Sequence, residues 1–155
     1  MGSEMCIRDR PSSGMIILTD IGDARTIHPM EKETVGNRFA YMALGLTYGK
    51  KGFPVTGPLY KSMQIEGNKI AVSFDEVGKG LTTYRQPLTG FEIAGEDRVF
   101  HPANAHLGKD AQTVVVSSPE VPHPVAVRYA FKDYVKGCLY NMFGLPVSSF
   151  RTDDW

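Results

Sequence analysis

Two carboxylates and one imidazole lie close together in the N-terminal part of the sequence. Asp20, Asp23 and His28 fall between positions 20 and 28, in a polar stretch that contains Gly22. A neutral imidazole accepts a hydroxyl proton near neutral pH, since its ordinary pKa is about 6.5. A carboxylate beside the ring fixes its tautomer and stabilises the imidazolium. The residue types therefore allow general-base catalysis, although the same side chains can also cap turns or pack.

The segments on either side of this loop predict how it is held. Met15–Thr19 is a short apolar run that indicates a buried strand of a parallel sheet. Residues 30–48 are predicted to form an amphipathic helix with an apolar stripe of Val35, Phe39, Met42, Ala43 and Leu46, and Gly49 follows as a candidate C-cap. Pro29 suits the first turn of that helix. Since open α/β sheets bind ligands at the carboxyl ends of their strands, we expect the loop to lie at such an edge.

The sequence pattern changes after a Gly/Pro segment at 50–58. Apolar and polar residues then alternate, which is typical of half-buried strands. The predicted strands surround turns rich in Gly, Asn and Asp, and lie at 63–65 and 70–74, 91–94 and 98–101, 112–117, and 125–131. This pattern favours an antiparallel β-sandwich.

We therefore expect two unequal units, a βα unit over 11–49 and a β-rich domain over 57–155. Residues 1–10 read MGSEMCIRDR, and the string from Met5 to Arg10 resembles the translation of an adapter used in sequencing libraries. We expect residues 1–10 to be such a scar and not native sequence. The native part would then be the C-terminal portion of a longer protein.

Composition excludes several classes of protein. Lys plus Arg and Asp plus Glu are 17 each, and a net charge of zero argues against nucleic acid or an anionic membrane as a partner. Two cysteines cannot form a disulfide scaffold. His101, His106 and His123 lack acidic or cysteine partners at ligand spacing, so we expect no metal site and no cofactor.

Several motifs in order resemble the sialate O-acetylesterases, carbohydrate esterases of the SGNH-hydrolase superfamily. They are Asp20-Ile21-Gly22-Asp23, Ile27-His28-Pro29, Lys32, Val35-Gly36, Arg38, Gly57-Pro58, Gly90 to Gly95, Val127 to Ala130, Gly144-Leu145-Pro146 and Phe150 to Asp153. The resemblance implies that residues 11–49 are the last βα unit of an SGNH-hydrolase-type, flavodoxin-like domain. A β-sandwich-like C-terminal unit would follow it.

The resemblance also implies a reaction, the removal of O-acetyl groups from sugars. In such enzymes a Ser attacks the acetyl carbonyl, a His takes its proton, and an oxyanion hole holds the intermediate. His28 matches the catalytic histidine of the family. Asp23 and Asp20 are the available carboxylates, because Arg25 stands where superfamily members often have Asp. A Ser–His dyad without a carboxylate remains an alternative.

The nucleophile of the family has no counterpart in this sequence. The sequence contains neither a Gly-Gln-Ser-Asn type motif nor Gly-x-Ser-x-Gly. We expect structural roles for Ser12, Ser13, Ser62, Ser73, Ser117, Ser118, Ser148 and Ser149. The parent protein would act on an O-acetylated sugar or glycan, and its missing N-terminal part would be a partner of this chain, which alone would be inactive. The family favours an extracellular or periplasmic parent, but the sequence leaves its location unknown.

A second reading makes the β-rich domain a non-catalytic accessory or sugar-binding module. That reading requires an exposed aromatic platform, and the candidates are Tyr84, Phe91, Phe100, Tyr129, Phe131 and Trp155, although Phe91 and Phe131 suit the core. The esterase reading instead requires an open His28 ring with a carboxylate near it. It also predicts exposed apolar surface from the set Ile16, Ile17, Leu18, Phe39 and Met42.

Overall fold

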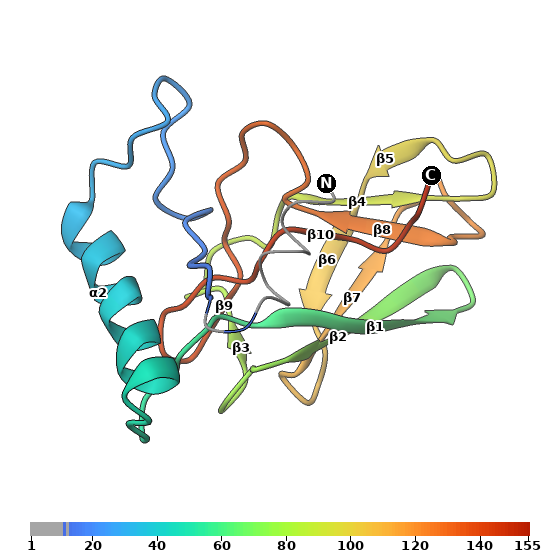
Figure 1. Cartoon of the computed structure of the whole chain (residues 1–155). Coiled ribbons are helices and arrows are strands. Elements are labelled where there is room, and N and C mark those ends of the chain that lie inside the picture. Colours follow the sequence, from blue (N-terminus) through green and yellow to red (C-terminus); the bar gives the residue numbers. More distant parts are fainter. Residues whose placement is uncertain (1–10, 12) are drawn as a thin grey trace.

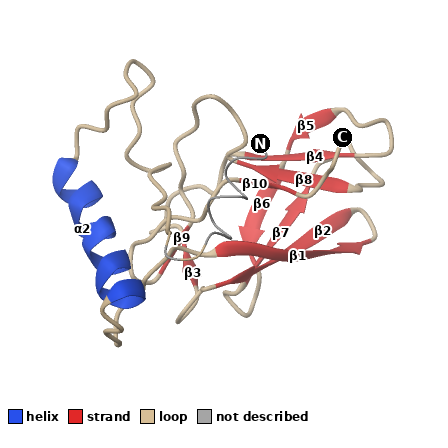
Figure 2. Ribbon diagram, in the orientation of Figure 1, coloured by secondary structure: helices blue, strands red, loops and turns tan. Residues whose placement is uncertain are grey.

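The computed structural model describes residue 11 and residues 13–155, so the predicted scar at 1–10 lies outside the described residues. In chain order the elements are α2 (Lys32–Met42), the π-helical turn η1 (Ala43–Thr47), β1 (Leu59–Glu66), β2 (Lys69–Asp75), β3 (Leu81–Thr82), β4 (Phe91–Ala94), β5 (Phe100–Pro102), β6 (Asn104–Leu107), β7 (Thr113–Ser117), β8 (Ala126–Tyr129), β9 (Tyr140–Asn141) and β10 (Phe150–Arg151). Most of the regular structure is antiparallel sheet, and α2 lies to one side of it (Figures 1 and 2).

Two four-stranded sheets form a β-sandwich around one core. Their strand orders are β1-β2-β7-β6 and β10-β8-β4-β5, and β3 pairs with β9 in a small third sheet. Alternate residues of the central strands point inward, because side chains of a strand alternate between its faces. The shared core contains Ile70, Val72, Val114 and Val116 from the first sheet, and Phe91, Ile93, Val127, Tyr129 and Phe150 from the second. The predicted antiparallel β-rich unit is confirmed.

The predicted hairpins also form. β1 pairs with β2 across a turn in which Gly67 adopts a φ of 66°, a conformation that favours glycine. β4 pairs with β5, with Ala94 opposite Phe100. The sequence pattern did not predict β6 or the two-residue strands β3, β9 and β10, which are too short to show a periodicity.

The prediction of a strand at Met15–Thr19 is wrong. These residues have no partner strand within the described part of the chain. Their backbone carbonyls are bonded in other ways: Ile17 O accepts from the Arg38 side chain, Leu18 O accepts from Ile21 N–H, and Thr19 O accepts from Gly137 N–H. In place of the predicted βα unit, the chain has a segment without strand pairing, held by hydrogen bonds, followed by a helix.

The helix forms, but only part of its predicted apolar stripe is buried. α2 begins at Lys32, after Pro29, and continues as η1 to Thr47, close to the predicted end. Its buried residues are Arg38 and Met42, whereas Phe39 and Leu46 of the predicted apolar stripe are 53% and 60% exposed. No helix of the described residues has the length and apolar content needed to cross a membrane.

The Gly/Pro segment after the helix lies against the C-terminal loop. A Cβ on Gly57 would collide with the carbonyl oxygen of Pro146, so the backbone approach requires glycine. Pro58 O accepts a hydrogen bond from Ser148 N–H at 3.2 Å. Two motifs that are distant in sequence, Gly57-Pro58 and Gly144-Leu145-Pro146, therefore meet at the junction between α2 and the sandwich.

Candidate functional site

His28 lies on an exposed loop between the segment at 15–19 and α2. The loop is folded by short-range bonds: Asp23 forms an isolated bridge with Thr26, and the His28 N–H donates to Thr26 Oγ1 at 3.2 Å. The His28 side chain is exposed, and its ring has no hydrogen-bond partner among the described residues. The imidazole is therefore open to a group that approaches from outside this loop.

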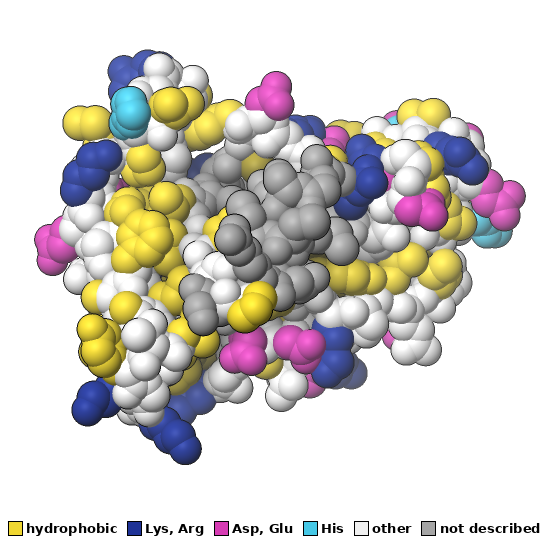
Figure 3. Space-filling view, viewed as in Figure 1, with side chains coloured by type: hydrophobic (Ala, Val, Ile, Leu, Met, Phe, Trp, Pro, Cys, Tyr) yellow, Lys and Arg dark blue, Asp and Glu magenta, His cyan; other side chains and the backbone are white. Residues whose placement is uncertain are grey.

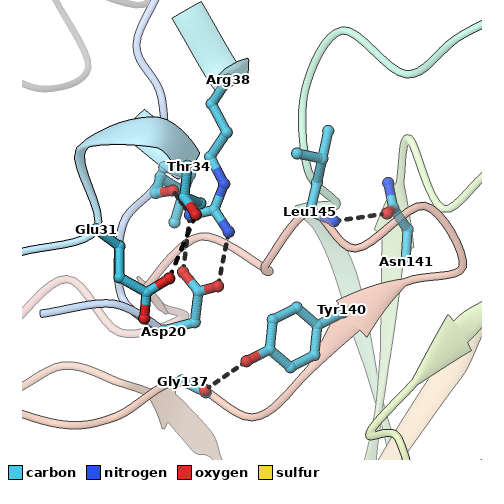
Figure 4. Close-up of polar contacts among 9 residues, drawn as sticks. Asp20, Glu31, Thr34, Arg38, Gly137, Tyr140, Asn141 and Leu145 are labelled. Carbon is cyan, nitrogen blue, oxygen red and sulfur yellow. Dashed lines mark hydrogen bonds and ion pairs between the residues drawn. The ribbon is translucent and has the colours of Figure 1, made fainter. Parts of the chain in front are cut away.

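Asp20 is bound to Arg38 and not to His28. Arg38 Nη1 donates to Asp20 Oδ1 at 2.8 Å, and Arg38 Nη2 donates to Asp20 Oδ2 at 2.6 Å (Figure 4). The two side chains are 7% and 9% exposed. Arg38 Nη1 also donates to Ile17 O at 2.7 Å. A bidentate charge-assisted pair of this kind is among the stronger polar contacts in proteins.

Asp23 is bound to Arg25 within the loop itself. Arg25 Nη2 lies 3.0 Å from Asp23 Oδ2, and the Arg25 backbone N–H donates to Asp23 Oδ1 at 2.9 Å. The side-chain hydrogen bond and then the backbone hydrogen bond lower the pKa of Asp23, so the carboxylate form is favoured. Neither carboxylate contacts the His28 ring in the described structure. The loop region thus holds the imidazole and the two carboxyl groups as separate units.

Sequence reasoning missed the role of two residues beside Asp20. Arg38 is part of the motifs quoted above, but no role was predicted for it. It lies one turn before Met42 on the same face of the helix, and an arginine on a buried face indicates a partner of opposite charge. Tyr140 lies near Asp20 and donates from its hydroxyl to Gly137 O at 3.3 Å (Figure 4). Burial, and then the nearby charge of Asp20, raise the pKa of Tyr140.

Apolar side chains are exposed around α2 and the loop before it. Figure 3 shows hydrophobic atoms gathered on the side of the molecule that holds α2. We call this surface the α2 apolar surface; its residues are Met15, Ile27, Met30, Phe39, Tyr41, Leu44, Leu46 and Tyr48. Of the five residues predicted to contribute exposed apolar surface, only Met42 is buried, so that prediction is confirmed. Exposed apolar patches of this kind mark interaction surfaces.

The other candidate chemistry is not assembled near His28. No hydrogen bond joins a described serine to the His28 ring, and the described residues contain no group of three or more His, Cys, Asp or Glu able to hold a metal ion. Ser12 lies outside the described residues. Ser62, Ser73 and Ser117 lie on strands of the sandwich.

The aromatic residues of the sandwich do not form the open platform that the module reading requires. Phe91 and Tyr129 are buried, and the guanidinium of Arg128 lies 3.8 Å from the ring centroid of Phe100. Trp155 is 38% exposed, and the guanidinium of Arg98 lies 5.0 Å from its ring centroid. Of the six candidate aromatics, only Tyr84 is more than half exposed.

The fold is similar to part of a known esterase. A solved carbohydrate acetylesterase from Xanthomonas citri matches this chain with a TM-score of 0.86 and 38% sequence identity. The match covers 94% of this chain and 33% of that chain, so this chain spans about a third of the esterase's length. No protein-family model matches the chain, and no curated protein matches it significantly.

Proposed function

We propose that this chain is the part of a carbohydrate O-acetyl esterase that carries the general base, His28. The observation that supports it most is the 38% identity to a carbohydrate acetylesterase over 94% of this chain. The exposed imidazole in the Ile27-His28-Pro29 motif agrees with it. The finer assignment, a serine esterase of the sialate O-acetylesterase type, rests on the motif resemblance.

In the proposed reaction His28 first accepts a proton from the serine hydroxyl and then donates it to the leaving sugar oxygen. A serine Oγ attacks the acetyl carbonyl carbon while one nitrogen of His28 takes the hydroxyl proton. The tetrahedral intermediate then loses the sugar oxygen, which leaves with that proton, and an acetyl-serine remains. Water attacks the acetyl-serine in the same way, which releases acetate and restores the serine. An oxyanion hole stabilises both intermediates.

The serine and the oxyanion hole would come from a segment outside these 155 residues. The acetylesterase has about two thirds of its length outside the match, and the α2 apolar surface offers a place for such a segment to bind. Ile27 is 90% exposed directly beside His28, so a segment bound there would also reach the imidazole. Burial of apolar surface contributes about 25 cal/mol per Å² to such an interface.

The carboxylate of the proposed triad is Asp23. Both oxygens of Asp20 are occupied by Arg38 in a nearly buried pair. Both oxygens of Asp23 also accept hydrogen bonds, but only from Arg25 within the loop that carries His28. Its present partner, Arg25, is 88% exposed, and exposed ion pairs of this kind contribute little to stability. Asp23 is therefore free to exchange Arg25 for the imidazole when the serine-bearing segment binds. The alternative is a Ser–His dyad.

The test is a chimaera in which residues 13–155 replace the matched third of the Xanthomonas citri acetylesterase. The probes are 4-nitrophenyl acetate and a fully acetylated glucose. We expect the chimaera to release acetate and the isolated chain to release none. A folded but inactive chimaera would overturn the proposal, and so would hydrolysis by the isolated chain that survives His28→Ala.

A further inference from the structure

Arg38 connects the two ends of the loop that carries His28. Its guanidinium bonds Ile17 O and both oxygens of Asp20, which lie before the loop, while its own backbone lies in α2, after the loop. Figure 4 shows the Arg38 side chain extending from α2 toward Asp20. One side chain thus fixes the distance between the segment that enters the loop and the helix that leaves it.

The loop has little other support. Between Asp20 and Glu31 the described hydrogen bonds are local. Ile21 N–H donates to Leu18 O, Arg25 and Thr26 donate to Asp23, His28 N–H donates to Thr26 Oγ1, and Lys32 N–H donates to Met30 O. The apolar side chains Ile27 and Met30 are 90% and 77% exposed and contribute little packing. The orientation of the loop therefore depends on how its two ends are held.

We infer that Arg38 and Asp20 are positioning residues that hold the His28 loop in one orientation. The catalytic part of this inference rests on the proposed function, which assigns His28 as the general base. The predicted effect on the order of the loop is independent of that assignment. Arg38 suits the role because its planar group bonds a carbonyl and two carboxylate oxygens at once, which the single ammonium of lysine cannot match. Gly137 N–H, which donates to Thr19 O at 2.9 Å, supports the same end of the loop.

The test measures backbone order in the isolated 155-residue chain by ¹⁵N relaxation. In the unaltered chain we expect order parameters near 0.85 for residues 21–30, and in Arg38→Met we expect them to fall below about 0.6. Arg38→Lys should give an intermediate loss. Asp20→Asn is the second variant if Arg38→Met does not fold, and it should loosen the same residues.

The matched control is Arg128→Met, which removes the arginine that is paired with the buried carboxylate of Asp153. A positioning role predicts that this variant lowers stability but leaves order at 21–30 unchanged. The inference fails if the loop is already flexible in the unaltered chain or if Arg38→Met leaves it ordered. It also fails if Arg38→Met and Arg128→Met loosen the loop equally. In an active chimaera, Arg38→Lys should lower kcat and leave KM unchanged. If every chimaera is inactive, the proposed function is rejected, but the relaxation measurements still test whether Arg38 and Asp20 hold the loop.

Discussion

Arg128 forms a bidentate pair with the buried Asp153 that ties the C-terminal segment to β8. Arg128 Nε and Nη2 donate to the two carboxylate oxygens at 2.9 and 2.7 Å, and the Asp153 side chain is fully buried. Arg128 also lies over the ring of Phe100 from β5. One side chain therefore joins an edge strand, a central strand and the end of the chain.

Removing Arg128 should destabilise the sandwich strongly. Arg128→Met leaves the Asp153 charge buried without its main partner, and we expect a loss of about 3–5 kcal/mol in the free energy of unfolding. Urea denaturation measures it. The control is Lys61→Met, since the Lys61–Asp75 pair is more than half exposed on both sides and should contribute less than about 1 kcal/mol. Equal losses in the two variants would contradict this account.

The same pair predicts a dependence of stability on acid. Burial raises the pKa of Asp153, but the hydrogen bonds and charge of Arg128 outweigh it, and the net shift is downward from 3.8. A depressed pKa gives stability that is present above the unfolded value and is lost as pH falls through the folded value. The difference in unfolding free energy between the unaltered chain and Asp153→Asn should therefore shrink below about pH 4. A difference that stays constant down to pH 2 would be inconsistent with this.

Tyr129 should stabilise the loop that ends at β9. Its buried hydroxyl accepts hydrogen bonds from Cys138 N–H and Leu139 N–H, both at 3.2 Å. Tyr129→Phe leaves two amides without a partner, and we expect a loss of about 1–3 kcal/mol in calorimetry or urea denaturation. Tyr60→Phe is the control, because the Tyr60 hydroxyl has no hydrogen bond within the described residues; it should change stability by less than about 0.5 kcal/mol.

Two glycines should respond in opposite directions to alanine. Gly57→Ala places a methyl group against Pro146 O and should destabilise the chain by about 1–3 kcal/mol. Gly36→Ala lies inside α2 with no atom within 4 Å of the new methyl group, and should stabilise it by about 0.5–1 kcal/mol. Thermal unfolding of both variants distinguishes them. A stable Gly57→Ala would show that the backbone contact at the α2 junction is not required.

The sequence was most informative where one face of a strand is buried. Val72 and Val116 alternate with outward residues because β2 and β7 each have a core side and a solvent side. At Met15–Thr19 the prediction failed, since four apolar residues followed by a threonine are compatible with a buried strand and with an unpaired, hydrogen-bonded segment equally well. Only a neighbouring strand distinguishes the two, and such a strand comes from a part of the chain that is distant in sequence, which a local pattern does not show.

The sequence named the candidate residues, but it did not predict the contacts that they make. The His28 side chain is exposed, as the esterase interpretation requires, but the carboxylate that it requires beside the ring is absent from the described structure: Asp23 binds Arg25 and Asp20 binds Arg38. Periodicity, however, placed Arg38 outside the apolar stripe of α2, and its partner Asp20 is 18 residues away in sequence. A buried ion pair across a loop leaves no local pattern, because each member is an ordinary charged residue in its own segment.

The most direct test of the esterase assignment is the effect of His28→Ala on kcat in the chimaera. If His28 is the general base, kcat for 4-nitrophenyl acetate should fall on the order of 10²–10⁴-fold, whereas His106→Ala on the exposed face of β6 should leave it unchanged. An active chimaera in which His28→Ala retains full kcat would contradict the account.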